Sequence, residues 1–166
     1  MSVVISDNRA DWDRFIRGLQ QVAHGPKAVV TGVQEGTSAE GGVSVADYAA
    51  TNEFGATIRR TGENGPIRPT IIPERPFMRL YFDNNLEKIG RFSENALTQA
   101  MFGRVTVNQA FTAIGLFTQK GLRAQIRRSQ DYVPNAPSTI KIKGSDKPLI
   151  DHAILLNNIN FEIRRD

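Results

Sequence analysis

Three closely spaced aspartates are the first residues of this chain whose type could support acid–base or metal chemistry: Asp7, Asp11 and Asp13. Catalysis requires a nucleophile with its base, a carboxylate pair or a set of metal ligands. These three carboxylates fall at the expected start of a helix, where the helix dipole favours negative charge. We therefore interpret them as helix-stabilising residues.

Two histidines complete the candidates for proton transfer. His24 falls at the end of the first helical pattern, where a cationic or capping residue is common. His152 follows Asp151 directly, but adjacent residues of a helical turn do not face each other. The sequence has no Gly-x-Ser-x-Gly motif, no His-Glu-x-x-His motif and no cysteine. We predict that the protein is not an enzyme and that it holds neither a cofactor nor a metal.

The glycine-rich segment 34–42, QEGTSAEGG, has the composition of a phosphate-binding loop. It lacks the Gly-Lys-Ser/Thr ending with which such loops hold phosphate and magnesium. We interpret the segment as a flexible loop.

Positive charge is concentrated in the segment 120–147, whose only acidic residues are Asp131 and Asp146. Such an excess can contact phosphate or an acidic protein surface, and it can equally form a solvated face. Tyr132 lies in the segment, but no helix-turn-helix, zinc module or stacking platform is recognisable. The basic residues of the segment are Lys120, Arg123, Arg127, Arg128, Lys141, Lys143 and Lys147.

Length and composition indicate a single domain spanning residues 1–166. The chain is 40% hydrophobic and 23% charged, with a net charge of +4, as is ordinary for globular proteins. No apolar run approaches the roughly 20 residues of a membrane-spanning helix, and the first residues lack the apolar core of a signal peptide. We expect a soluble protein made in the cytoplasm.

Apolar periodicity predicts an α+β fold, in which a small mixed or antiparallel β-sheet packs against two longer α-helices. The longer helices are expected over about 86–103 and 106–128 as an antiparallel pair, with Gly90, Gly115 and Gly121 allowing close approach. Shorter helices are expected over 8–23 and 45–54. The first of these carries one apolar stripe, made of Trp12, Phe15, Ile16, Leu19 and Val22.

Residues 57–72 are expected to form a β-hairpin with its turn at 62–65. Two further strands are expected over 27–33 and 159–164. Pro69 lacks the N–H that a central ladder needs, so we expect an edge or a protruding arm. A mobile surface hairpin is the alternative. Three arginines of this arm are candidates for contact with a neighbouring subunit: Arg59, Arg60 and Arg68.

The connector 73–77, Pro-Glu-Arg-Pro-Phe, should be rigid because two prolines fix its backbone. Pro76 suits the first turn of the following helix. The stiff backbone would hold Arg75 in place, and we expect this residue to form a structural salt bridge with a carboxylate.

The segment 131–163 has the most distinctive pattern in the chain. Pro134 and Pro137 favour an extended entry. Ser138 is expected to cap a short helical turn that Gly144 ends, and Asp151 to cap a second one over 152–157. In the closing strand, alternate residues should share a buried face: Ile159, Phe161 and Ile163.

Three blocks of this sequence together resemble a family of head–tail joining and tail-completion proteins of tailed bacteriophages. They are AATNEFG at 49–55, IPERPFMR at 72–79, and YVPNAPSTIKIKGSDKPLID at 132–151 followed by LNNINFEI at 156–163. The family usually has Thr-Gly after the aspartate, where this chain has His152-Ala153.

The resemblance implies a small α+β subunit of the phage neck or upper tail. Such proteins assemble as rings, commonly six-fold, around the channel that the DNA crosses, and they contact adjacent neck or tail proteins. It implies a virion protein assembled in the cytoplasm of a bacterial host, with genomic DNA as a non-specific partner and no membrane.

Our hypothesis from sequence is that the arm 57–72 and the basic loop 130–148 are interlocking surfaces of such a ring. The candidate interface or channel-facing residues are Arg59, Arg60, Arg68, Arg123, Arg127, Arg128, Lys141, Lys143 and Lys147. The alternative is a small DNA-binding accessory protein without sequence preference, acting as a monomer or dimer.

Overall fold

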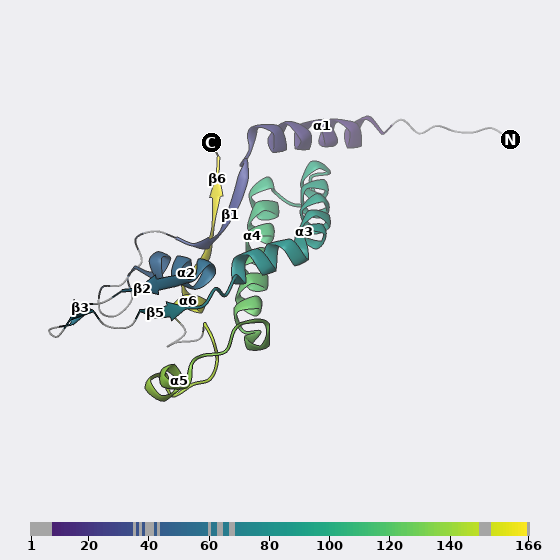
Figure 1. The fold of residues 1–166 in the computed structure, drawn as a ribbon. Helices are drawn as coiled ribbons and strands as arrows, with labels where there is room; N and C mark the ends of the chain where they lie inside the picture. The colour runs from purple at the N-terminus through teal and green to yellow at the C-terminus, as the bar shows by residue number, and fades with distance from the viewer. Residues whose placement is uncertain are drawn as a thin grey trace. The chain divides into compact units, whose positions relative to one another are not determined.

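The computed structural model describes residues 8–34, 36, 38, 42, 44–59, 61–62, 65–66, 69–149 and 154–165 (Figure 1). The helices are α1 (Arg9–His24), α2 (Val45–Phe54), α3 (Phe77–Met101), α4 (Val107–Ile126), the 3-10 helix η1 (Ser129–Asp131), α5 (Pro137–Lys143) and α6 (Ile154–Asn157). The strands are β1 (Ala28–Val33), β2 (Ala56–Ile58), β3 (Thr61–Gly62), β4 (Gly65–Pro66), β5 (Thr70–Ile72) and β6 (Ile159–Arg164).

The predicted α+β class is confirmed, but the described strands do not form one small sheet. Within the described residues they form three two-stranded ribbons, β1 with β6, β2 with β5 and β3 with β4. The last two ribbons are antiparallel and together make the predicted hairpin, with Ala56 opposite Ile72 and Thr61 opposite Pro66. Strands of two or three residues offer too few ladder positions to recruit further neighbours.

The chain divides into two compact units, to which α3, α4, β1 and β6 each contribute residues. Unit 1 comprises Met1–Val30, Leu86–Thr118 and Phe161–Asp166, and unit 2 comprises Thr31–Asn85 and Gln119–Asn160. The prediction of one domain over 1–166 stays a prediction.

The core of unit 1 forms where the end of α3 meets the start of α4. Ala100, Val107, Ala110 and Phe111 are buried there, packed against residues from α1, β1 and β6. Thr106 and Gln109 cap α4 reciprocally: the Gln109 N–H donates to Thr106 Oγ1 at 3.1 Å, and the Thr106 N–H donates to Gln109 Oε1 at 2.8 Å. This capping box starts α4 at the predicted place.

Helix α1 occupies its predicted range, but its apolar stripe is only partly covered: Phe15, Ile16 and Val22 are half-buried. Trp12 is 62% exposed and Leu19 is 41% exposed, whereas the buried residue of the helix is Gly18. A Cβ at position 18 would lie 2.0 Å from the Met101 carbonyl oxygen. The helix therefore approaches the end of α3 through its glycine, and this leaves Trp12 and Leu19 exposed.

Helices α3 and α4 form the predicted antiparallel pair. The rings of Phe92 and Phe117 stack with centroids 4.3 Å apart in unit 1. In unit 2, a Cβ on Gly121 would lie 2.2 Å from the Tyr81 hydroxyl oxygen. Gly115 likewise faces a ring, that of Phe161, whereas a Cβ on Gly90 would have nothing within 4 Å. The close-approach prediction for the helix pair is thus right for Gly121 and wrong for Gly90, whereas Gly115 makes room for a ring of β6 and not for α3.

The caps of the shorter helices follow the sequence with one correction. Ser44 Oγ accepts the Asp47 N–H at 3.3 Å to start α2, and Gly144 ends α5 in the left-handed conformation. Helix α5 begins at Pro137 with Ala136 as its N-cap, so the expected cap at Ser138 is wrong. Proline at the first helical position fixes the start two residues earlier. The expected cap Asp151, with His152, lies outside the described residues.

The buried glycine of α1 gives a test of this packing. We expect Gly18→Ala to lower the free energy of unfolding by about 1–3 kcal/mol, because its methyl group would clash with the backbone of Met101. Gly90→Ala is the matched control, since the open space there should let alanine raise stability by roughly 0.5–1 kcal/mol. Thermal and urea denaturation measure both, and equal effects of the two substitutions would contradict the packing of α1.

Candidate functional site

The carboxylate of Glu53 lies at the centre of unit 2. Helix α2 buries Val45, Ala49 and Asn52 on one side, and Glu53 falls on that same side with a side chain only 5% exposed. Its two oxygens accept the N–H groups of Met78 at 2.9 Å and Arg79 at 3.1 Å. These are N–H groups of the first turn of α3, which have no partner within their own helix.

Pro76, the residue before α3, explains why this cap comes from another helix. Its side chain has no oxygen with which to accept a first-turn N–H, so an external acceptor is needed. Glu53 supplies both the acceptors and a negative charge at the positive end of the helix dipole. Helix α2 is thereby fixed to the beginning of α3.

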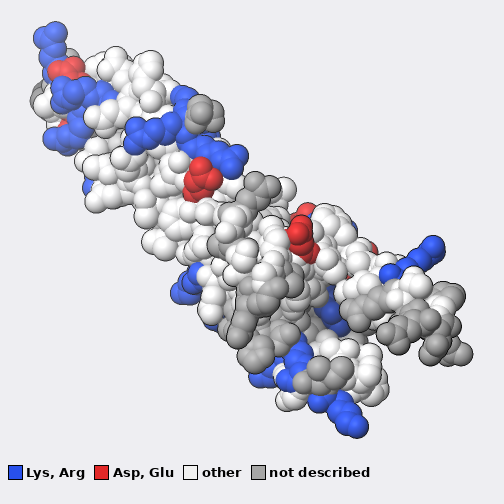
Figure 2. Space-filling view, turned by 90° about the vertical axis from the view of Figure 1, so that its left-hand side faces the viewer, with Lys and Arg blue, Asp and Glu red and all other residues white. Residues whose placement is uncertain are grey.

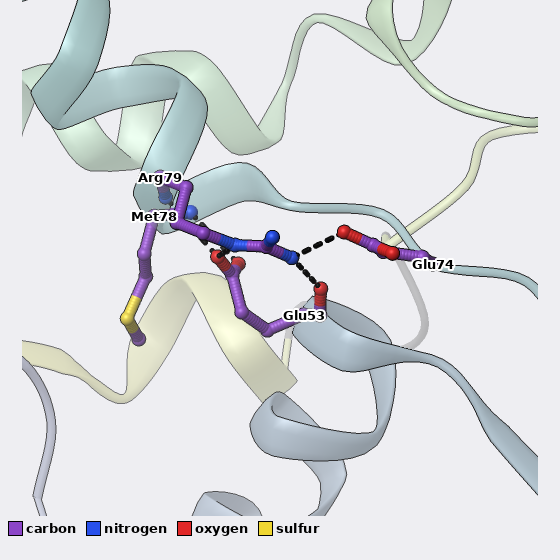
Figure 3. A network of polar contacts seen from close by, with 4 residues as sticks. All are labelled: Glu53, Glu74, Met78 and Arg79. Atoms are coloured by element: carbon purple, nitrogen blue, oxygen red, sulfur yellow. Dashed lines mark hydrogen bonds and ion pairs between the residues drawn. The ribbon is translucent and has the colours of Figure 1, made fainter.

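The side chain of Arg79 completes the network (Figure 3). Its Nε donates to Glu53 Oε1 at 3.0 Å, and one terminal nitrogen donates to the Glu53 carbonyl oxygen at 2.7 Å and also to Glu74 Oε1. The hydrogen bonds to Glu53, followed by those to Glu74, raise the pKa of the Arg79 guanidinium above its ordinary value. The guanidinium of Arg79 is half-exposed, whereas the carboxylate of Glu53 is not.

Arg75 forms a second, buried network with neutral oxygens. Its Nε donates to the Val133 carbonyl at 3.0 Å, and its terminal nitrogens donate to Asn135 Oδ1 at 3.1 Å and to the Pro134 carbonyl at 3.5 Å. Burial lowers the pKa of this guanidinium, and the nearby Tyr48 raises it. The expected salt bridge of Arg75 is wrong for the described residues, since the rigid connector points the side chain at backbone carbonyls.

Asn52 joins Arg75 to α2. Its backbone carbonyl oxygen accepts the backbone N–H of Arg75 at 2.7 Å, and its side-chain Oδ1 accepts from the Arg75 guanidinium at 3.5 Å. Gly55 lies against the same connector, because a Cβ there would be 3.0 Å from the Ile72 carbonyl oxygen and 3.1 Å from the Glu74 nitrogen. With φ at +70°, this position also favours glycine.

Tyr132 anchors the start of the C-terminal block to the end of α4. Its hydroxyl donates to the Gln125 carbonyl oxygen at 2.8 Å, and Gln125 Nε2 donates to Asp131 at 2.9 Å. Burial, the largest cause, raises the pKa of Tyr132 to about 12. The tyrosine therefore acts as a neutral hydrogen-bond donor.

These contacts bring the three sequence blocks together in one cluster, which we call the block junction: Asn52, Glu53 and Gly55 from 49–55; Glu74, Arg75, Met78 and Arg79 from 72–79; and residues 133–135 from the third block. Its carboxylate oxygens already accept hydrogen bonds from backbone and guanidinium groups. The arrangement is suited to fixing backbone segments relative to one another.

Sequence reasoning missed three buried polar residues of the junction: Asn52, Glu53 and Asn135. A signal existed for the first two. Ala49 and Val45 occupy the inward face of α2, and helical spacing places Asn52 and Glu53 on the same face. Polar residues at such positions indicate a buried hydrogen-bonding partner. Asn135 gave no comparable signal, because it lies in an irregular segment between prolines.

Among the predicted interface residues, Arg123 has a partner inside the chain. A terminal nitrogen of its guanidinium donates to the Ile159 carbonyl oxygen at 2.8 Å, beside Gln119, which donates to the same oxygen. The side chain is half-buried. This contact assigns Arg123 a structural role in holding β6, and its role at an interface stays a prediction.

The structure places the three lysines of the basic loop in the last turn of α5 and just after it. Lys141 and Lys143 lie in the last turn of α5, where positive charge complements the helix dipole. Lys143 Nζ donates to the Lys147 carbonyl oxygen at 3.1 Å, and Lys141 and Lys147 are exposed. Arg59, Arg127 and Arg128 are exposed too, whereas Arg60 and Arg68 lie outside the described residues.

Figure 2 shows the Lys and Arg side chains of the described residues on the drawn face, with fewer Asp and Glu side chains among them. Within the described part of the chain, no group of three His, Cys, Asp or Glu side chains could hold a metal ion. None of the described helices is long and apolar enough to cross a membrane.

Comparison with known proteins gives no match for this chain among family models, curated proteins or solved structures.

The capping role of Glu53 can be tested by substitution. Glu53→Gln should lower the free energy of unfolding by about 1–3 kcal/mol. The amide has one acceptor oxygen where the carboxylate has two, and it lacks the negative charge that favours the helix start. Glu74→Gln removes an exposed carboxylate from the same guanidinium, so its denaturation midpoint should move little. Urea unfolding measures both, and a Glu53→Gln protein as stable as the control would refute the cap.

Tyr132 predicts a stability loss at high pH. In the folded protein the pKa of Tyr132 is raised from 10.0 to about 12. The stability that depends on the neutral hydroxyl is therefore fully present below about pH 10 and is lost as the pH rises toward 12. This shift corresponds to roughly 2–3 kcal/mol. We expect Tyr132→Phe to be less stable than the wild type at pH 8, because it lacks the hydrogen bond to Gln125. Between about pH 10 and 12 the wild type should lose up to the free energy of this shift relative to the variant, because only the wild type has a hydroxyl that ionises. Denaturation curves across this range would contradict the assignment if the difference stayed constant.

Proposed function

We propose that this protein is a structural subunit of the neck or upper tail of a tailed bacteriophage, where copies form a ring that joins head to tail around the DNA channel. The observation that carries the proposal is the block junction. The three blocks that resemble the head–tail joining family lie far apart in sequence, and their residues form one hydrogen-bonded cluster. A resemblance arising by chance would not require its parts to meet.

The junction lies at the base of the two segments that we propose as interlocking surfaces. Gly55 immediately precedes the hairpin of β2–β5, and the connector that holds Arg75 follows it. The same guanidinium holds residues 133–135, which lead into α5 and the basic loop. Glu53 and Arg75 thus fix both ends of the hairpin and the entry to the loop. A subunit that acts by shape needs such rigid bases beneath its contact segments.

Exposed apolar side chains near these segments support contact with neighbours. Phe54 is 67% exposed, Ile71 on the hairpin is 72% exposed, and Val133 at the start of the loop is 51% exposed. In a closed ring each subunit would present the hairpin to one neighbour and receive the equivalent contact from the other. Six-fold symmetry is proposed from the resemblance.

The exposed cations of unit 2 would face genomic DNA without sequence preference, or an acidic surface of an adjacent neck or tail protein. Lys141, Lys147, Arg127 and Arg128 are exposed and available for this role. In this proposal the protein transforms no substrate, needs no cofactor and resides in the virion.

Charge reversal in the basic loop tests the proposal in the phage that encodes the protein. Deletion of the gene should give separate filled heads and tails in electron micrographs, and the wild-type gene should restore joined particles. Lys141→Glu with Lys147→Glu should lower the yield of infectious particles at least tenfold, because two proposed contacts change sign.

The control for this test is Lys88→Glu with Arg91→Glu, which makes the same charge change on α3. It should restore joined particles as the wild-type gene does. Complete particles without the gene, or full complementation by the Lys141 and Lys147 variant, would count against the proposed function.

A further inference from the structure

Unit 1 contains a basic concavity that the proposed ring contacts do not use. Its volume is about 340 Å³, and it is formed by α1, the turn between α3 and α4, and the beginning of α4. Its polar lining residues are Arg14, Arg17, Gln21, Arg104, Thr106 and Gln109. None of the carboxylates in the described part of the chain lines it.

The three guanidinium groups differ in how far they are already engaged. Arg14 pairs with the exposed Asp11 at 3.2 Å. Arg104 donates to Gln99 at 3.2 Å and lies 5.9 Å from the centre of the Phe102 ring. Arg17 has no hydrogen bond or ion pair within the described residues. The concavity therefore keeps donor capacity for an anionic ligand.

The start of α4 contributes neutral polar side chains to the concavity. Thr106 and Gln109 line it, and their reciprocal cap already occupies the N–H groups of both residues, so the donors for an anion are the arginines. Arginine is the side chain best suited to phosphate, because its planar fork donates two parallel hydrogen bonds. Three guanidinium groups around one opening suit several linked phosphates better than one isolated phosphate.

Close packing holds these elements in position before any ligand binds. Gly18 lets α1 approach the backbone of Met101. Gly103, with φ at +68°, lies under the stem of Arg14, because a Cβ there would be 3.1 Å from the Arg14 Cγ and Cδ atoms. The arginines thus project from a fixed helix and a fixed turn.

A second, apolar depression adjoins the basic one at the same turn. It is lined by Trp12, Phe15 and Phe102 together with Asn8 and Asp11, whose carboxylate pairs with Arg14, whereas Gly103 and Arg104 line the basic concavity. The ring centre of Phe15 lies 5.9 Å from that of Trp12 and 5.3 Å from that of Phe102. Exposed aromatic rings beside a positively charged groove are typical of proteins that stack unpaired bases and track their phosphates.

We propose that this face of unit 1 binds single-stranded nucleic acid without sequence preference. The phosphates lie in the concavity against Arg14, Arg17 and Arg104, and an unpaired base stacks on Trp12. An acidic peptide would match the cations but would leave the aromatic depression without a partner of its own. This inference goes beyond the proposed ring and does not depend on it, because it concerns a single subunit.

The test uses the full-length chain and a fluorescently labelled 16-nucleotide thymidine strand. Binding is followed by fluorescence anisotropy, and contact with Trp12 is followed by quenching of its emission, since it is the only tryptophan of the chain. Inorganic phosphate and polyglutamate serve as alternative ligands. We expect the strand to bind and quench, and phosphate and polyglutamate to cause no quenching.

Substitution of the three arginines identifies the surface. Arg14→Gln, Arg17→Gln and Arg104→Gln together should weaken binding on the order of a hundredfold at low salt and reduce the log–log salt slope by about 2. The matched control removes the same charge from exposed positions outside the concavity, by Lys88→Gln, Arg91→Gln and Arg164→Gln, and should lower the affinity far less. Arg14→Lys, Arg17→Lys and Arg104→Lys together keep the positive charge of the concavity and should recover part of the affinity.

Three outcomes would overturn the inference. They are equal weakening by the two glutamine triples, binding of the strand without quenching of Trp12, and polyglutamate binding that competes with the strand and quenches equally. Circular dichroism melts of every variant show whether a loss of binding reflects unfolding. Because these measurements use the isolated subunit, their result is independent of whether the protein is found in the phage neck.

Discussion

The carboxylate of Glu53 is the constraint on which the structure of unit 2 depends. Helix α3 starts after Pro76, which cannot cap it, so two N–H groups of its first turn require an acceptor from elsewhere. Glu53 meets that requirement from the last turn of α2, with bonds of 2.9 and 3.1 Å. A buried carboxylate is costly unless its oxygens are hydrogen-bonded. The helix start and the buried acid therefore stabilise each other, and neither sequence block is suitably placed without the other.

The consequences of this constraint extend along the connector. Once α2 and α3 are fixed to each other, the residues between Gly55 and Pro76 must leave and return at defined points, which is the geometry of a hairpin. Arg75 then carries the constraint onward, since its guanidinium holds the carbonyls of Val133 and Pro134. Truncating such a buried charge would leave these oxygens unpaired and would loosen the entry to the basic loop. Rigidity at the base and exposed side chains at the ends are what the proposed role in assembly would require.

Much of the fold could be predicted from local sequence. The helices expected over 45–54 and 106–128, the stop at Gly144 and the closing strand over 159–164 correspond to the observed elements, because each depends on residues within a few positions. What could not be predicted depends on distant contacts. The exposure of Trp12 follows from Gly18 meeting Met101, and the partners of Arg75 lie some 60 residues further along the chain. Of the candidate site, the three blocks were recognised, but Asn52, Glu53 and Asn135, through which they meet, were not.

The central claim is that this chain acts as a fixed part of a phage particle. An electron cryomicroscopy reconstruction of the neck of the phage that encodes it tests that claim most directly. The account predicts a closed ring of density between head and tail into which unit 2 fits, with the hairpin of β2–β5 against the adjacent copy. Mature particles that contain no copy of the chain, or a neck whose density is filled by other proteins, would contradict it.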